Sequence, residues 1–536
     1  MKQPNRGESM MNRRFQKLHF GPKPISILLL FIALFSYSQR NESLNPESLP
    51  IFIKGLYSLP RNLDPIKAND TASLLVSQLL YSGLLKFEND LSYSPDLAES
   101  WELDQAGTTY TFKLRKNISF HNGMPITAND VTKSLERALS KASVVYKYYE
   151  CIEGAKEFYQ GKSIEVKGIK VITPDMLQIK LTNPFPPFLS VLAGATAKVL
   201  PINNIQSDPL FFEHPIGSGP FRFLKMIKTT NDYGEMELES FQQTSADSPH
   251  IKKLRLLALT ESEALKLATE GKIHDLSNFP LSGSEAAFKV GKKIDSPVAA
   301  TWIIGLNTRI APFDKLSVRQ AFKFSVPTEK FRNKFYNDSI PAYGYIPIGL
   351  PGHISAPPES LQPAKAPKHT EIKIAIPSVL SKHKEMIDFF HSELRPLGWN
   401  VTFVPMGWDE LMKGYDEKSL QGFLVSMNMD YPETEFLIRN FESNNPDNFS
   451  GLNNPQIDLM IQKARLVTDK IQRTKFYQEV LNKIEEQAVT INLFHPRSHF
   501  WIHTCVTGFL PNILSDYYID FRKVGLDANC LQAANP

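Results

Sequence analysis

At 536 residues the chain is too long for one hydrophobic core, so its length predicts two or three domains. The composition, with 42% hydrophobic and 22% charged residues, is that of an ordinary globular protein. The formal charge of +4 is concentrated at the front, since residues 1–38 carry six basic residues against Glu8 alone and the rest carries 54 basic and 55 acidic residues. A nearly neutral body argues against nucleic-acid binding as the main function.

The front of the chain is predicted to be a signal peptide over residues 1–38. A basic stretch precedes the apolar run Ile25–Phe35, which at 11 residues is too short to span a bilayer comfortably. Small polar residues follow, and we expect cleavage near Ser38. No cysteine stands there for lipid attachment, so in a two-membrane bacterium the product would be periplasmic. An uncleaved membrane anchor is the alternative.

The most informative stretch, Pro95–Leu139, is predicted to form a hairpin followed by a helix. Apolar residues alternate with polar ones on both sides of the turn at Gly107, which indicates two half-buried strands. Thr127 is positioned to cap the helix, with Asp130 in its first turn.

The amino-acid sequence of this stretch resembles that of the family-5 extracellular solute-binding proteins, the peptide-binding components of ABC importers. The matching residues are the PDLAESWE run at Pro95, the YTFKLR run at Tyr110 and the FHNGMPITANDV…SLER run at Phe120. The segments LDP at Leu63, GSGPF at Gly217 and APFD…VRQA at Ala311 are also similar to the family. The resemblance implies an α/β, two-lobed periplasmic binding protein fold (type II-like), in a three-domain variant with a small extra domain.

We expect the chain to divide after the signal peptide into lobe 1 (first segment, 39–90), a small extra domain (91–195), lobe 1 (second segment, 196–300), lobe 2 (301–490) and a return to lobe 1 (491–536). Within these, Tyr146–Gly161 is predicted to be an amphipathic helix, and Val489–Ile502 one strand returning to the first lobe. A strand–helix–strand passage over residues 372–404 indicates an α/β layer in lobe 2.

The candidate ligand-binding residues are Asp430, Tyr431, Met427, Asn428 and Trp408. A carboxylate at the carboxyl end of a strand lies where α/β domains usually bind ligands, although Asp before Tyr-Pro is also good turn chemistry. The resemblance implies that Asp430 pairs with the α-ammonium of a bound peptide. Such a pair offsets the cost of burying a cation between lobes.

The site departs from the pattern of oligopeptide binders in two places. These carry an arginine six residues before the aspartate and a tryptophan three before, where this chain has Leu424 and Met427. Either another basic residue therefore meets the carboxyl end of a ligand, or the far end of the ligand is not a free carboxylate.

The sequence supports an enzyme less well than a binding protein. His495, His499 and His503 recur every four residues, but Pro496 argues against the helix that would align them as metal ligands. Gly161-Lys162-Ser163 ends like a phosphate-binding loop, yet Lys156 stands where that loop needs glycine. Three cysteines leave at least one unpaired, and Cys505 with Cys530 can close a loop.

These observations predict a monomeric periplasmic protein without catalytic activity, metal or cofactor, which binds short peptides and delivers them to an inner-membrane ABC permease. The alternatives are the same fold with another cargo (a cell-wall peptide, nickel chelate, haem or sugar), an exported metal-dependent hydrolase, or a periplasmic sensor or chaperone.

Overall fold

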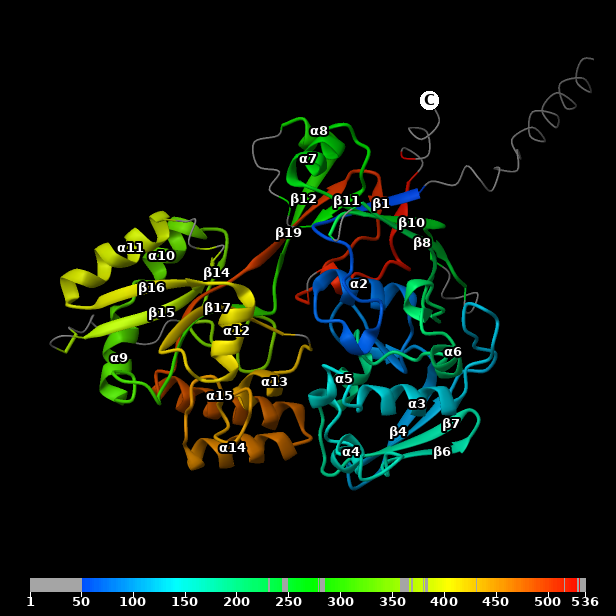
Figure 1. The fold of residues 1–536 in the computed structure, drawn as a ribbon, viewed down its shortest axis with the longest axis horizontal. Helices are drawn as coiled ribbons and strands as arrows, with labels where there is room; N and C mark the ends of the chain where they lie inside the picture. Colours follow the sequence, from blue (N-terminus) through cyan, green and yellow to red (C-terminus); the bar gives the residue numbers. More distant parts are fainter. Residues whose placement is uncertain are drawn as a thin grey trace, which may run out of the picture. The chain divides into compact units, whose positions relative to one another are not determined.

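Two large mixed sheets and one smaller antiparallel sheet organise the chain (Figure 1). The computed structural model describes residues 51–229, 232–242, 249–277, 279, 285–356, 366–367, 370–378, 380, 384–429, 431–514, 516–527 and 530. The predicted signal peptide and Asp430 therefore lie outside the described residues. Within the described ranges, no helix combines the length and the apolar character needed to cross a bilayer.

The seven-stranded sheet combines segments from the front, middle and end of the chain. Its strands in spatial order are β12 (Gly291–Pro297), β19 (Arg497–His503), β11 (Asp275–Ser277), β1 (Ile51–Leu56), β10 (Lys253–Ala258), β9 (Gly234–Ser240) and β8 (Phe221–Lys228). The central strand β1 runs parallel to β10 and β11. The helices of this region are α2 (Thr71–Leu80), α6 (Ile202–Ser207), α7 (Glu261–Thr269) and α8 (Ala287–Val290).

A charged pair lies in the centre of this sheet. The side-chain nitrogen of Lys54 donates to Asp275 at 2.7 Å and to Ser277 at 2.8 Å, and the side chains of Lys54 and Asp275 are both fully buried. Buried charges persist only when they are paired and hydrogen-bonded, so this contact ties β1 to β11.

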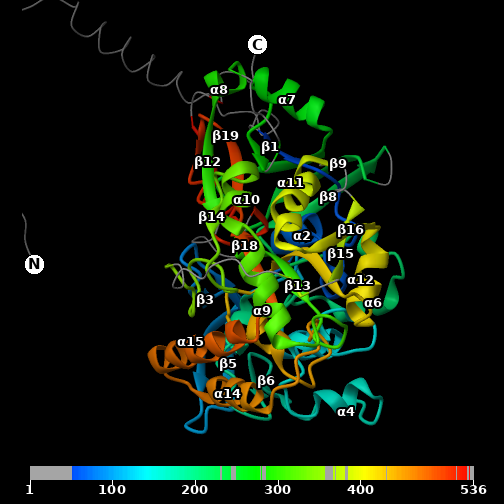
Figure 2. The ribbon, with the colours of Figure 1, turned by 90° about the vertical axis from the view of Figure 1, so that its left-hand side faces the viewer.

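The six-stranded sheet has the order β14 (Ile340–Pro341), β18 (Thr490–His495), β13 (Ala300–Leu306), β17 (Gly422–Asn428), β15 (Glu371–Pro377) and β16 (Asn400–Met406). The parallel pair β15–β16 is connected through α11 (Lys384–Leu394), which confirms the predicted strand–helix–strand passage. The other helices here are α9 (Leu316–Ser325), α10 (Thr328–Phe335), α12 (Trp408–Asp416), α13 (Glu435–Ile438), α14 (Pro455–Leu466) and α15 (Lys470–Glu486). Helices α14 and α15 pack together as a hairpin (Figures 1 and 2).

The smaller sheet has the order β4 (Ala98–Leu103), β5 (Thr109–Leu114), β7 (Met176–Lys180) and β6 (Ile169–Thr173), with α3 (Ala128–Ala138) packed on it. The predicted hairpin and helix are thus confirmed. The backbone N–H and the hydroxyl of Thr127 both donate to the Asp130 carboxylate, at 2.9 and 2.7 Å, which completes the predicted cap. Short elements nearby are β2 (Leu85–Phe87), β3 (Tyr93–Pro95), α4 (Ala155–Tyr159) and α5 (Phe188–Ala193).

The predicted helix over Tyr146–Gly161 is wrong. The structure has a 3-10 turn at Tyr146–Tyr148, and α4 begins only at Ala155. Gly154 has a φ of 82°, a left-handed conformation that interrupts a right-handed helix. Apolar spacing alone did not reveal this break.

The predicted single strand over Val489–Ile502 is also wrong, because it is two strands in two sheets. β18 pairs with β13 in the six-stranded sheet, whereas β19 pairs with β11 and β12 in the seven-stranded sheet. Pro496 separates them, and its carbonyl accepts from the Val298 N–H at 3.0 Å, so the two chain crossings between the sheets lie side by side. Figure 1 shows this passage from β18 into β19. The final short strands β20 (Val506–Thr507) and β21 (Gly525–Leu526) pair with each other.

Candidate functional site

A cavity of about 370 Å³ lies at the carboxyl end of β17. Four of the five residues singled out from the sequence line it: Trp408, Met427, Asn428 and Tyr431. The fifth, Asp430, lies outside the described residues, but both its neighbours line the same cavity. The remaining lining residues come from the 3-10 turn at 146–148, from α12, from β17 itself and from the chain after it; they are Lys147, Tyr148, Met412, Tyr415, Asp416, Val425, Ser426, Met429, Phe436, Leu437, Arg439, Asn440 and Asp447.

The wall formed by α12 presents an exposed aromatic ring. Trp408 is the first residue of this helix and remains 59% exposed, although tryptophan is usually well buried. Leu411 in the same helix is fully buried and anchors α12 in the core. The helix therefore fixes its backbone by packing and leaves the indole available to a ligand.

Tyr431 lines the cavity as a buried side chain rather than as an exposed polar group. Its side chain is only 2% exposed, and its hydroxyl hydrogen-bonds with the Thr196 hydroxyl at 2.9 Å. Thr196 also bonds with Tyr149 at 3.1 Å, so Tyr431 joins the six-stranded side of the molecule to the side that carries α5. Burial raises the pKa of Tyr431 well above its ordinary value, and the phenol therefore stays neutral.

A second hydrogen bond joins the same two sides of the molecule. The Ser190 hydroxyl, on α5, donates to the Glu433 carboxylate at 2.6 Å. Burial raises the pKa of this carboxyl. Figure 1 shows α5 and α13 facing each other in this region. On the α5 side of Tyr431 lies another cavity of about 290 Å³, which shares Lys147, Tyr148 and Tyr431 with the first.

The charged residues of the cavity were not identified from the sequence. The Lys147 ammonium lies 3.2 Å from the Asp447 carboxylate, and the Arg439 guanidinium lies 3.5 Å from the same oxygen. Burial by itself would raise the pKa of Asp447, but Lys147 and Arg439 outweigh it and hold this pKa below its ordinary value. Because Lys147 and Asp447 are 300 positions apart, no local pattern connects them.

The position six residues before Asp430 cannot supply a cation to the cavity. Leu424 is 1% exposed and packs in the hydrophobic core on one face of β17. The alternation of a strand directs Val425 and Met427 to the other face, where both line the cavity.

The three histidines considered as metal ligands have different surroundings. His495 is fully buried beside the Thr301 hydroxyl at 3.0 Å. His499 lies between two carboxylates, with Asp295 at 2.7 Å and Asp338 at 2.9 Å. His503 lies against Cys505, with its Nδ1 2.8 Å from the sulfur. The strand geometry of β18 and β19 thus gives them separate partners.

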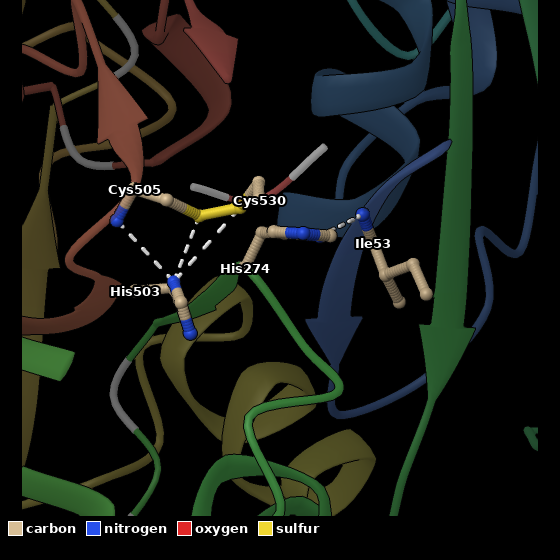
Figure 3. The surroundings of a disulfide bond; sticks show 5 residues. All are labelled: Ile53, His274, His503, Cys505 and Cys530. Atoms are coloured by element: carbon tan, nitrogen blue, oxygen red, sulfur yellow. Dashed lines mark hydrogen bonds between the residues drawn. A yellow bond between two sulfur atoms is a disulfide. The ribbon is translucent and has the colours of Figure 1, made fainter. Parts of the chain in front are cut away.

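Cys505 and Cys530, the pair that can close a loop, form a disulfide, and Cys151 is the free cysteine. Figure 3 shows His274 and His503 beside the disulfide. Among the described residues, the group with the proximity needed for a metal site is His274 with these two cysteines, all within 4.8 Å. Two observations argue against it: the sulfurs are bonded to each other, and the His274 Nδ1 accepts the Ile53 N–H at 2.9 Å.

Comparisons with known proteins agree with this architecture. Residues 92–449 match the sequence model of the bacterial extracellular solute-binding proteins, family 5. The chain is 25% identical over 492 residues to the glutathione-binding protein GsiB of Pectobacterium atrosepticum, covering 87% of this chain and 92% of that protein.

Solved structures share the fold. The murein tripeptide-binding protein MppA of Escherichia coli superposes with a TM-score of 0.74 at 19% identity, over 89% of this chain and 98% of that one. The periplasmic binding protein DppA of Helicobacter pylori, in complex with the peptide STSA, gives a TM-score of 0.73 at 20% identity, over 90% and 100%. The predicted two-lobed α/β fold is therefore confirmed, and the chain belongs to family 5 of the bacterial extracellular solute-binding proteins, the substrate-binding proteins of ABC importers.

Proposed function

We propose that this protein captures short peptides with a free amino terminus in the cavity at the end of β17 and delivers them to an inner-membrane ABC permease. The observation that carries the proposal is that Met429 and Tyr431, the two sequence neighbours of Asp430, both line that cavity. A peptide amino group, with a reference pKa of about 7.7–8.0, is largely protonated at neutral pH. A carboxylate at this place would offset the cost of removing that cation from water.

The rest of the cavity suits the body of a peptide. Trp408 and Met427 offer apolar, adaptable contacts, and Asn428 offers both a donor and an acceptor to the peptide main chain. The names of similar proteins support this class of cargo, since DppA is described with the peptide STSA and GsiB with glutathione, itself a small peptide. We infer binding without catalysis, because the family is one of solute-binding proteins.

We further propose that residues 1–38 direct export, that the protein acts in the periplasm as a monomer, and that its lobes close around the ligand. The paired crossings at Val298 and Pro496 are the natural hinge, because they are the places where the chain passes between the two large sheets. Closure would then be favoured by ligand contacts made only in the closed form.

The test is calorimetric titration of the full chain with tripeptides, such as trialanine and glutathione, in free and N-acetylated forms. The proposal predicts that acetylation weakens binding at least tenfold, which corresponds to about 1.4 kcal/mol. Asp430→Ala should cause a similar loss for the free peptides and little change for the acetylated ones. Equal binding of both forms by the wild type would show that Asp430 has a different role.

A further inference from the structure

Lys147 lines three neighbouring cavities. It lines the 370 Å³ cavity at the end of β17 and the 290 Å³ cavity beyond Tyr431. It also lines a third cavity of about 450 Å³. Arg439 and Asp447 line the first and the third. These three charged residues therefore form the boundary across which a ligand would extend from the β17 cavity.

The two cations approach this boundary from opposite sides of the molecule. Lys147 belongs to the 3-10 turn that follows α3, whereas Arg439 follows α13 beside the six-stranded sheet. Each lies over an aromatic face: the Lys147 nitrogen is 5.5 Å from the centre of the Tyr148 ring, and the Arg439 guanidinium carbon is 5.6 Å from that of Phe436. Aromatic faces attract cations without using their hydrogen-bond donors.

The described contacts engage these donors only weakly. Both cations meet the same Asp447 oxygen, at 3.2 and 3.5 Å, whereas a full charge-assisted hydrogen bond is about 2.7–2.9 Å long. Asp447 itself is restrained by its backbone, since its N–H donates to the Asn445 side chain at 2.8 Å. One carboxylate held in place therefore faces two cations that carry eight donors between them.

We propose that Lys147 and Arg439 bind the carboxylate of the cargo, so that the protein selects peptides that carry a free carboxyl group as well as a free amino group. This inference rests on the proposed function. It assigns the carboxyl end of the ligand to two cations other than the arginine that Leu424 replaces. The guanidinium fork can hold a carboxylate through two parallel hydrogen bonds, and the ammonium adds a third from the opposite side. Because the cations come from both sides, the carboxylate favours closure of the cleft.

Asp447 competes with the ligand carboxylate for Lys147 and Arg439. In the structure it neutralises part of the charge of the pair, and with a ligand bound it would lie close to a second carboxylate. Replacing it by asparagine keeps the shape and one acceptor oxygen but removes the negative charge. Asp447→Asn should therefore increase the preference for a free carboxylate, and Arg439→Gln should reduce it.

The experiment compares trialanine with trialanine amide by calorimetry on the full chain. The wild type should bind the acid at least tenfold more tightly than the amide. Arg439→Gln and Lys147→Met should each lose most of that preference, measured as the ratio of the two dissociation constants in the same variant. Arg395→Gln and Lys162→Met, which change exposed residues that line none of these cavities, are the matched controls.

The outcomes separate this inference from the proposed function. Equal binding of acid and amide by the wild type, with N-acetyl trialanine still rejected, would overturn the carboxylate assignment and leave the peptide assignment intact. Binding of neither form, under conditions where another small molecule co-purifies, would overturn both. A preference for the acid that survives in the Lys147→Met, Arg439→Gln double variant would assign the carboxylate to other residues.

Discussion

The ring of Tyr431 lies directly against Gly194, so that a Cβ atom at position 194 would come within 2.3 Å of the Tyr431 Cε1 atom. This contact joins the chain segment after β17 to the segment after α5, and it explains why a glycine stands there although its φ of −71° is open to any residue. Space, and not backbone conformation, requires the glycine.

Gly194→Ala should displace the Tyr431 ring and weaken its bond with Thr196. Overpacking of this kind costs about 1–3 kcal/mol, and we expect the free energy of unfolding in urea to fall by that amount. Gly407→Ala is the control, because a Cβ there meets no heavy atom within 4 Å. A Gly194→Ala protein as stable as the wild type would mean that this contact is not part of the solution structure.

The Lys54–Asp275 pair gives a second prediction. Both side chains are fully buried, so removing one partner leaves an uncompensated charge. Asp275→Leu should lower the free energy of unfolding by about 3–5 kcal/mol. The double variant Lys54→Met, Asp275→Leu should recover a large part of this loss, because both charges are then absent. A double variant less stable than Asp275→Leu would contradict this reading.

His274 predicts a dependence of stability on pH. Burial, with a smaller contribution from His503, lowers the pKa of His274 from 6.5 to about 4. Between pH 6.5 and 4 the unfolded chain therefore binds a proton that the folded chain does not, and stability falls as the pH falls through this window. Urea unfolding at pH 7 and at pH 4.5 measures the effect.

The matched variant isolates the contribution of this histidine. His274→Asn should reduce the loss of stability between pH 7 and pH 4.5 by an amount on the order of 1–3 kcal/mol. Identical pH dependence in the wild type and His274→Asn would contradict the assignment.

Trp408 supplies an optical readout of binding. Its indole is 59% exposed on the wall of the 370 Å³ cavity, so a ligand that covers it should shift its fluorescence to shorter wavelength. The other tryptophans are more buried, and Trp399 is 1% exposed. The shift on adding peptide should disappear in Trp408→Phe. A shift of unchanged size there would show that the signal comes from another tryptophan and would contradict this assignment.

Much of the fold could be predicted because its local signals are strong. The hairpin at Ala98–Leu114 and the capped helix α3 follow from alternation and from Thr127, and the strand–helix–strand passage over residues 372–404 follows from its apolar pattern. The two errors share a cause. Gly154 and Pro496 interrupt segments whose apolar spacing continues across them, and the sheet that a strand joins depends on distant partners.

The sequence predicted mainly the part of the site whose residues lie close together in the chain. Met427, Asn428 and Tyr431 are close in sequence, and the structure brings Trp408 to the same cavity. Their role as ligand-binding residues, like the domain boundaries and the role of Asp430, stays a prediction. Lys147 and Arg439 were missed because their proximity arises from the packing of two lobes, which no spacing in the sequence records.

The measurement that tests the central claim most directly is native mass spectrometry of the protein purified with its endogenous ligand. We expect a bound species whose mass and fragmentation are those of a short peptide and which an amine-specific reagent modifies after release. A released haem, nickel chelate or sugar would contradict the peptide assignment, while the two-lobed fold would stand.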